Sequence, residues 1–317
     1  MSATGPRRVV LAGTGTPGVR QHHQRDMYLP AVRAMDAVEV VGVLAGGDAD
    51  RSAELADLAG VPVLDPAGGP AEADLVILCP DVGRPEQLAD LLSRCTDAAV
   101  PVLMDKPTLL DDTTLAELAA WFPTVVPAFH PRFHPALTSA RARVATGGLG
   151  LLHAVHGELL VGSTDGPHPR GELRNLAVYA LDVVAALLGE LRGRAHAVIA
   201  PPGPDSCGES LTLSLRCEPD VVVTLLVGRA GEGTGASMLH RYRVLGSHGQ
   251  LLVDLDSPAV ELVGSVDRIP FGPSAIEQMI AATLAGATRT GLTGALALAR
   301  VIAALEQSAR ERAVVPF

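Results

Sequence analysis

The chain has 317 residues, which is enough for about two domains of ordinary size. Apolar residues make up 48% of it and charged residues 19%, and its apolar runs end within about ten residues, short of the ~20 that span a bilayer. With 25 Lys and Arg against 35 Asp and Glu, the net charge of -10 repels phosphate backbones and anionic membrane surfaces, so we expect neither nucleic acid nor membrane as a partner.

The cysteines and the N-terminal sequence indicate the compartment. The four cysteines form neither a Cys-x-x-Cys pair nor a dense framework, and the first residues lack an apolar segment followed by a cleavage site. We therefore expect a reduced, globular, cytoplasmic protein. High Ala, Gly and Arg content with scarce Lys fits a GC-rich bacterial genome.

Residues 7–130 alternate short apolar runs with helix-like stretches, which is typical of a parallel sheet with crossover helices. Strands are expected at 8–13, 38–44, 61–64, 73–79, 100–104 and 124–129. Amphipathic helices are expected at 50–59, 84–95 and 111–121, the last beginning near an N-cap at Asp111 or Asp112. This half of the chain is predicted to be an α/β Rossmann domain.

After Phe133 the pattern changes to strands that follow one another with turn residues between them. A helix over 134–146 precedes a strand at 151–161, and a long apolar helix covers 175–189. Further strands are expected at 194–200, 209–217, 220–228, 240–246 and 249–254, and helices at 274–286 and 292–311. This order predicts an α+β domain with a largely antiparallel open sheet.

A Gly-x-Gly-x-x-Gly motif follows the first strand and precedes a helix-like segment. Glycine there lets the backbone turn tightly and lets a pyrophosphate approach the helix N-terminus. An ordinary glycine-rich turn is the alternative. The motif predicts a dinucleotide site that includes Gly13, Gly15, Thr16, Pro17 and Gly18.

The second strand lacks the acid that usually holds the ribose hydroxyls of NAD. The sequence there is Leu44, Ala45, Gly46 and Gly47, which leaves room for a 2′-phosphate that Arg51 could pair with. Arg51 could equally be a solvated helix residue, and Asp48 or Asp50 could replace the acid. We expect NADP(H) to be slightly preferred over NAD(H).

Lys106 is the only lysine, and Asn175 is the only asparagine. Codon bias explains their scarcity but not their positions. Lys106 follows the fifth strand, where open α/β sheets place their ligands. Lysine, unlike arginine, is a compact charge that can lose or donate a proton near neutral pH when desolvated.

In order and spacing, several segments resemble the glucose-fructose oxidoreductase/inositol dehydrogenase family, also called Gfo/Idh/MocA, over nearly the full length. They are the glycine motif at 13–18, Cys79-Pro80, Asp105-Lys106-Pro107, and the segments 129–135, 148–150, 171–182, 242–254 and 304–315. The resemblance implies a dinucleotide-binding Rossmann domain at 1–127 and a substrate-binding and oligomerisation domain at 128–317. It also implies hydride transfer at C4 of a nicotinamide and a homodimer or homotetramer.

Segment 171–182 departs from the family pattern Asp-x-x-x-His-x-x-Asp, since it has Asn175, Tyr179 and Asp182 at those positions. Residues spaced i, i+4 and i+7 share one helix face. The resemblance suggests that Tyr179 replaces histidine as proton donor or acceptor, while Asn175 hydrogen-bonds the tyrosine or a substrate hydroxyl. The alternative is a buried structural tyrosine in a site that has lost catalysis.

Together these features predict an NAD(P)-dependent oxidoreductase acting on a C=O/CH-OH centre of a sugar, sugar nucleotide or cyclitol. Lys106 would polarise the carbonyl and Tyr179 would deliver the proton, with Asn175 as the third catalytic residue. Alternatives are an imine reductase and a non-catalytic dinucleotide-binding regulatory protein. No metal is expected, because no metal-like cluster is apparent in the spacing. Substrate contacts are expected from Asp182, His130, Arg132 and Arg174, and further cofactor contacts from Ala45, Arg51, Cys79, Pro80, Arg84, Asp105 and Lys106.

Three of these assignments have a plainer alternative. His130 and Arg132 could form a domain-interface ion pair instead of contacting nicotinamide or substrate. Arg84 could simply begin a helix. Cys79 could be a small apolar filler beside the cofactor.

Overall fold

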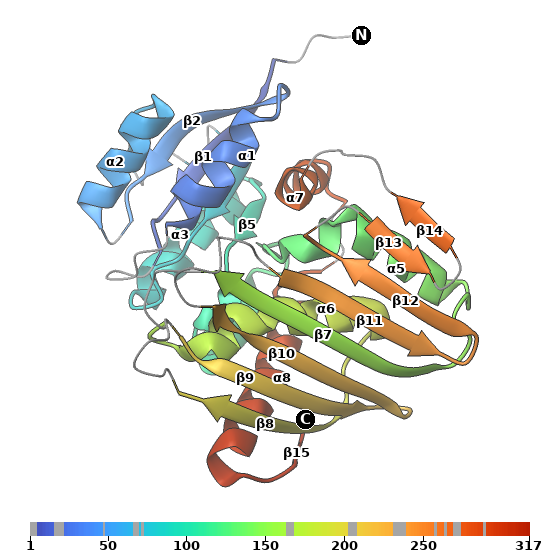
Figure 1. Cartoon of the computed structure of the whole chain (residues 1–317). Coiled ribbons are helices and arrows are strands. Elements are labelled where there is room, and N and C mark those ends of the chain that lie inside the picture. Colours follow the sequence, from blue (N-terminus) through green and yellow to red (C-terminus); the bar gives the residue numbers. More distant parts are fainter. Residues whose placement is uncertain are drawn as a thin grey trace. The chain divides into compact units, whose positions relative to one another are not determined.

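The computed structural model divides the chain into two compact units, which are described separately (Figure 1). Unit 1 comprises Met1–Phe129 and Ile276–Leu296, and unit 2 comprises His130–Ala275 and Ala297–Phe317. The second segment of unit 1 lies in the stretch that the sequence assigned to the second domain, and the domain boundary stays a prediction. The structure describes residues 5–15, 22–46, 48–65, 70, 73–162, 168–201, 208–230, 239–256, 259–262, 265–268, 274–287 and 290–317.

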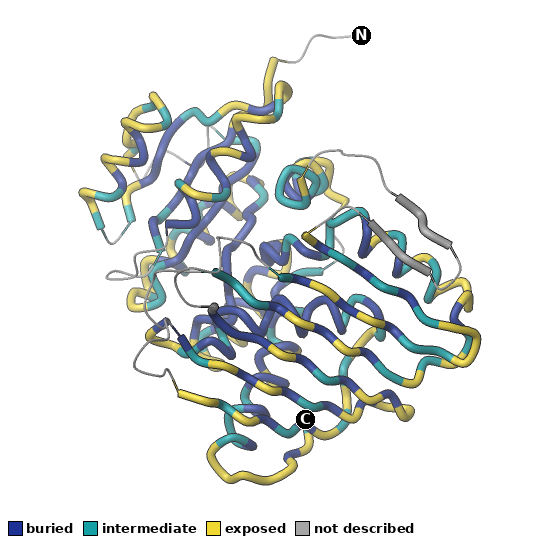
Figure 2. Tube along the Cα trace, in the orientation of Figure 1, coloured by how far each residue is buried: buried dark blue, intermediate teal, exposed yellow. Residues whose placement is uncertain are grey.

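The described part of unit 1 contains a six-stranded sheet in which every pair of neighbours is parallel, in the order β3-β2-β1-β4-β5-β6. Its strands are β1 (Arg7–Ala12), β2 (Val38–Leu44), β3 (Val63–Leu64), β4 (Leu75–Leu78), β5 (Val102–Met104) and β6 (Val126–Pro127). Strand β4 is buried along its whole length, as expected for a parallel strand covered on both faces. The neighbouring strand β1 is buried over its last four residues, which appear dark blue in Figure 2. This is the order of a dinucleotide-binding doubly wound sheet, and it confirms the predicted fold.

The helices of unit 1 begin where the sequence supplies caps. The side chain of Asp48 accepts a hydrogen bond from the Arg51 amide and caps α2 (Ala49–Ala59). Asp111 accepts from Thr114 and caps α4 (Asp112–Trp121), as predicted. The other helical elements with residues in this unit are η1 (Gln24–Tyr28), α1 (Leu29–Arg33), α3 (Pro85–Asp97), η3 (Pro107–Leu109), α7 (Ala275–Leu284) and the start of α8 (Leu292–Glu311).

Among its described residues, unit 2 contains a nine-stranded sheet in the order β14-β13-β12-β11-β7-β10-β9-β8-β15. Only the β7–β10 pair is parallel within this described sheet, which confirms the predicted largely antiparallel arrangement. The expected strands are β7 (Leu152–Gly162), β8 (Gly193–Ala200), β9 (Ser210–Cys217), β10 (Val221–Ala230), β11 (Leu239–Gly246) and β12 (Gly249–Asp254). The sequence missed β13 (Ala259–Leu262), β14 (Ser265–Arg268) and β15 (Val315–Pro316).

One face of this sheet packs against helices α5 (Pro135–Ala145) and α6 (Val178–Leu188) (Figure 1). Helix α6 continues from η5 (Leu173–Ala177). Together they correspond to the helix predicted at 175–189, and η5 begins two residues before it. The short turn η4 (His130–Phe133) precedes α5. On β10, Val223 and Leu225 are fully buried, whereas Val222 is 47% exposed, so the opposite face of the sheet is open.

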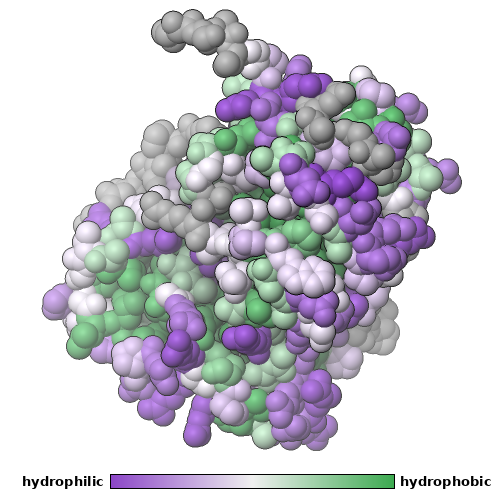
Figure 3. All heavy atoms as spheres, turned by 180° about the vertical axis from the view of Figure 1, so that it is seen from behind, coloured by the Kyte–Doolittle hydropathy of each residue, from purple (hydrophilic) through white to green (hydrophobic). Residues whose placement is uncertain are grey.

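The surface opposite to the view of Figure 1 carries hydrophilic residues interspersed with hydrophobic ones (Figure 3). Within the described residues, no helix is both long enough and apolar enough to cross a membrane.

Candidate functional site

The glycine motif of unit 1 lies where the carboxyl ends of β1, β2 and β4 meet. Gly13 has a φ of +69°, and a side chain there would clash with the carbonyl oxygen of Cys79. The Gly15 amide donates to that oxygen at 3.1 Å, with a φ of +82° at Gly15. Both positions therefore favour glycine. The remaining motif residues lie outside the described residues: Thr16, Pro17 and Gly18.

Backbone packing leaves no room for a side chain at position 46, just after β2. A Cβ on Gly46 would lie 2.8 Å from the Cα of Gly13, so an acid at this position would push the nucleotide loop out of place. The Gly46 amide donates to Ser52 Oγ at 3.1 Å. Asp48, one candidate replacement acid, uses Oδ1 to accept from the Arg51 amide at 3.0 Å.

A pocket of about 310 Å³ opens beside these glycines, within unit 1. It is of the size that small-molecule sites reach. Its lining brings together five predicted positions, namely Gly13, Ala45, Cys79, Pro80 and Arg84. Helix α3 contributes a further face of the pocket that was not predicted from the sequence, and it includes Gln87, Leu88, Asp90, Leu91 and Arg94. Residues three, four, seven and ten positions after Arg84 share one face of a helix, so helical periodicity would have identified Gln87, Leu88, Leu91 and Arg94.

Lys106 ends β5 in an unusual backbone conformation. It is 4% exposed, and its φ of 42° and ψ of 56° lie in the left-handed region, which non-glycine residues seldom adopt. The amide of the preceding Asp105 donates to Leu78 O at 2.8 Å, which fixes the end of β5 against β4. The only lysine is therefore buried and held at the carboxyl end of a central strand, where the sequence analysis placed it.

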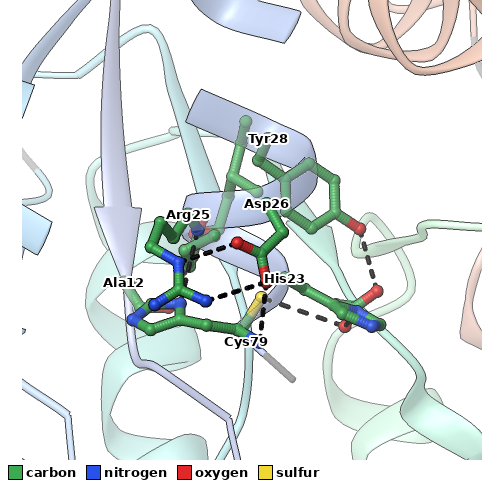
Figure 4. Close-up of polar contacts among 10 residues, drawn as sticks. Ala12, His23, Arg25, Asp26, Tyr28 and Cys79 are labelled. Carbon is green, nitrogen blue, oxygen red and sulfur yellow. Dashed lines mark hydrogen bonds and ion pairs between the residues drawn. The ribbon is translucent and has the colours of Figure 1, made fainter. Parts of the chain in front are cut away.

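The carboxylate of Asp105 is held by two residues of the segment that follows the glycine motif. Nδ1 of His23 lies 2.6 Å from Oδ2, and the Tyr28 hydroxyl donates to Oδ1 at 2.9 Å (Figure 4). Burial alone would raise the pKa of Asp105, but His23, Lys106 and Tyr28 outweigh it and lower the pKa to about 2. His23 and Tyr28 were not predicted from the sequence. A cofactor contact by Asp105 stays a prediction.

Cys79 and Gln24 are two further buried side chains at the carboxyl ends of β1 and β4. Burial raises the pKa of the Cys79 thiol well above its usual value, and Asp105 adds to the effect, so this thiol stays protonated. Nε2 of Gln24 donates to Ala12 O at 3.1 Å and to Ile77 O at 2.8 Å. Gln24 thereby ties η1 to the ends of β1 and β4.

In unit 2, the only asparagine joins a buried ion pair. Asn175 Nδ2 donates to Glu172 Oε2 at 2.7 Å, and Arg229 Nε donates to Glu172 Oε1 at 2.7 Å. Glu172 and Asn175 are both fully buried. Glu172 was not predicted from the sequence; it supplies a carboxylate three residues before the position where the family pattern has its aspartate.

The next turn of the same helix presents Tyr179 and Asp182, which both contact η4. The Tyr179 ring lies 5.0 Å from the His130 ring, measured between centroids. Arg132 Nε donates to both oxygens of Asp182, at 2.6 and 2.7 Å. Burial raises the pKa of Asp182 to about 7, although Arg132 and Arg141 act in the opposite direction. The two η4 side chains thus contact the two predicted positions of α6.

Strand β11 places a buried imidazole, that of His240, in this unit. His240 Nε2 lies 2.8 Å from the Tyr242 hydroxyl. Burial and the neighbouring His130 and His134 lower the pKa of His240 to about 3, so it is neutral at pH 7. Burial, helped by Asp182, raises the pKa of Tyr242 well above its usual value. Neither side chain was predicted from the sequence, although both lie on the inward face of a predicted strand, two positions apart.

Two further predictions concern Arg174 and metals. Arg174 donates to both carboxylate oxygens of Glu306 on α8, at 2.7 and 3.0 Å. This ion pair engages its guanidinium, and a substrate contact stays a prediction. No group of three or more His, Cys, Asp or Glu that could hold a metal ion occurs among the residues that the structure describes.

Comparison with known proteins identifies the fold. No protein-family model and no curated protein sequence matches the chain. An oxidoreductase from Agrobacterium radiobacter, in complex with NAD+, L-tartaric acid and magnesium, is 15% identical with a TM-score of 0.77, and the match covers 98% of each chain. Levoglucosan dehydrogenase, in complex with NADH and levoglucosan, is 15% identical with a TM-score of 0.76, covering 98% of this chain and 99% of the other.

A myo-inositol dehydrogenase from Corynebacterium glutamicum is 18% identical with a TM-score of 0.75, and the match covers 98% of this chain and 99% of that one. The chain therefore has the fold of these proteins over nearly its full length. This confirms, at the level of the fold, the resemblance inferred from the sequence motifs.

Proposed function

We propose that the protein is a nicotinamide-dependent oxidoreductase that interconverts C=O and CH-OH on a small polyhydroxylated substrate. The observation that carries this proposal is the pocket of unit 1, where Gly13 and Gly46 pack backbone against backbone and keep side chains out. A dinucleotide needs such a close backbone approach at the carboxyl ends of β1 and β2. Bound there, it would supply or accept the hydride.

The nucleotide site would be held by residues of unit 1. Gly13 and Gly15 would face the pyrophosphate, while Ala45, Pro80 and Arg84 would line the adenosine end of the pocket. Lys106 lies buried at the end of β5, in the same sheet edge. Its ammonium would polarise the substrate oxygen, which needs a compact cation shielded from water.

Proton transfer would fall to Tyr179 of unit 2. Tyr179 belongs to helix α6, is 6% exposed, and has the ring of His130 packed beside its own ring. Asn175 is oriented by Glu172, and Asp182 by Arg132, so both are held rigidly enough to position a substrate hydroxyl. Tyr179 would deliver a proton to the carbonyl oxygen in reduction and remove it in oxidation.

The substrate class is supported by the structural neighbours. One of them is a complex with levoglucosan and another is a myo-inositol dehydrogenase. We propose a sugar, sugar nucleotide or cyclitol as the substrate here. The first test is hydride transfer followed at 340 nm with NAD+ and with NADP+, using myo-inositol, levoglucosan and D-glucose.

Turnover of a polyol would support the proposal, and turnover of cyclic imines alone would indicate an imine reductase. Cofactor binding without turnover of either class would indicate a non-catalytic dinucleotide-binding protein.

Cofactor preference is a separate proposal. The close approach of Gly46 to Gly13 excludes a ribose-binding acid at position 46, which favours NADP(H). Two of the neighbours named above were solved with NAD+ or NADH and give this preference no support. Parallel titrations with NADH and NADPH decide between the two.

Self-association is proposed through the open face of the sheet in unit 2. Val222, Leu226 and Val198 are 47%, 37% and 55% exposed on that face. Exposed apolar residues gathered on one sheet face commonly mark an interface. Light scattering of the purified protein would show a dimer or tetramer if the proposal holds, and a monomer would contradict it.

A further inference from the structure

An imidazole from outside helix α6 lies against Tyr179. His130 begins η4, and its ring and the Tyr179 ring are 5.0 Å apart, with their planes inclined at 53°. Both residues belong to unit 2. His130 Nδ1 and the Tyr179 hydroxyl oxygen are both shielded from solvent. His130 as a whole is only half-buried, so solvent reaches other atoms of the same residue.

We propose that His130 is a proton relay between solvent and Tyr179, an inference that rests on the proposed function. In reduction, the cofactor would supply the hydride to the carbonyl carbon, and the carbonyl oxygen would receive the proton of the Tyr179 hydroxyl. The O–H bond of Tyr179 breaks and leaves a phenolate. The protonated imidazole of His130 returns a proton to that phenolate, and neutral His130 then takes one from water. Each turnover consumes one hydride and one solvent proton.

The burial of Tyr179 makes such a relay useful. With 6% of the residue exposed, water has little access to its phenolate. An ordinary phenol also titrates near pH 10, far from neutrality, whereas an imidazole titrates near pH 6.5 and both gives and takes protons there. The helix motif has tyrosine where the family that it resembles has histidine. In this chain, η4 places an imidazole beside that tyrosine.

Asp182 on α6 is paired and His240 on β11 is neutral, which leaves His130 to transfer protons to Tyr179. On α6, Asp182 is paired with Arg132, so neither charge is free to exchange with Tyr179. On β11, His240 is held neutral at pH 7 by burial and by repulsion from neighbouring imidazoles, and its Nε2 contacts the Tyr242 hydroxyl. Helix α5 has His134 at its start and Arg141 and Arg143 within it, and β11 has Arg241 and Arg243 at exposed positions.

The relay is tested by removing the nitrogens of His130 while keeping a ring against Tyr179. His130→Phe does this, and His130→Ala leaves a space that free imidazole can enter. His134→Asn is the matched control, because asparagine keeps the N-cap of α5 and removes a nearby imidazole. Initial rates are measured from pH 5.5 to 9 with the polyol that the wild type turns over, and cofactor affinity is measured in parallel.

We expect His130→Phe to lower kcat by roughly tenfold to a hundredfold, within the range of general acid-base contributions, with cofactor affinity unchanged. Asp182, whose pKa burial raises to about 7, contributes its own pH dependence near neutrality in both proteins, so rescue by imidazole identifies the relay. Free imidazole should restore the rate of His130→Ala but not that of His130→Phe. In a Tyr179→His background, which returns the imidazole to α6, His130→Phe should have little further effect.

An unchanged kcat and pH profile in His130→Phe would overturn the relay while leaving the proposed function intact. A loss that imidazole does not restore in His130→Ala, accompanied by weaker cofactor binding, would assign His130 a structural role and also overturn the relay. If the wild type binds cofactor and turns over no carbonyl compound or polyol, the proposed function fails, and the relay fails with it.

Discussion

The buried carboxylate of Asp105 makes a specific prediction about acid stability. The network around it lowers its pKa from 3.8 to about 2, so the charged form is stabilised in the folded state. Each pKa unit corresponds to about 1.4 kcal/mol, which makes this contribution about 2 kcal/mol. Because the folded pKa lies below the unfolded one, the contribution is complete above pH 4 and is lost as the pH falls toward 2.

Asp105→Asn removes this charge with little change of shape. We expect the wild type to have a larger free energy of unfolding than the variant at pH 6. This difference should shrink by about 1 kcal/mol between pH 6 and pH 3, and by about 2 kcal/mol between pH 6 and pH 2. Urea denaturation followed by circular dichroism measures both proteins at each pH. Asp36→Asn, at an exposed position before β2, makes the same change of charge outside the network and serves as the control.

A difference between wild type and Asp105→Asn that stays constant from pH 6 to pH 2 would refute the reasoning. It would mean that the contacts of His23 and Tyr28 do not favour the ionised carboxylate in the folded state.

Two further predictions concern Lys106 and Arg132. Lys106→Arg keeps a positive charge but replaces a compact ammonium that can release its proton. Steady-state kinetics should therefore show kcat lowered by about a hundredfold, with cofactor affinity changed by less than about threefold. An unchanged kcat would remove the role assigned to Lys106. Arg132→Leu leaves Asp182 buried without its partner, and because Asp182 is protonated at low pH, the variant should lose about 2 kcal/mol more stability at pH 8.5 than at pH 5. Equal losses at both pH values in denaturation experiments would contradict the raised pKa of Asp182.

The sequence predicted the parts of the fold that depend on local pattern. Continuous apolar runs identify parallel strands because both faces of such strands are buried, as β4 shows. The spacing of Tyr179 and Asp182 placed both on one side of α6, where each contacts η4. Strands β13 and β14 were missed because the segment after Asp254 contains proline, glycine and serine among short apolar stretches.

The contacts that the sequence could not predict join residues far apart along the chain. His23 and Asp105 are 82 positions apart, and Arg229 and Glu172 are 57 apart. Local pattern identifies neither partner, because each pair forms only when separate elements pack together. The α3 face of the nucleotide pocket is an intermediate case. The sequence shows which residues of α3 share a face, but which face lines the pocket depends on how the helix packs against the sheet.

Cofactor binding tests the central claim most directly. Ala45 lines the pocket and is exposed, so Ala45→Trp should fill the site without disturbing the core, whereas Ala53→Trp places the same side chain on an exposed position of α2 outside the pocket lining. Calorimetric titration with NADPH and NADH should show that wild type and Ala53→Trp bind at least one of them, with affinity at least about tenfold weaker in Ala45→Trp. Absence of binding to the wild type, or equal affinity in both tryptophan variants, would contradict the assignment of this pocket to a nicotinamide dinucleotide.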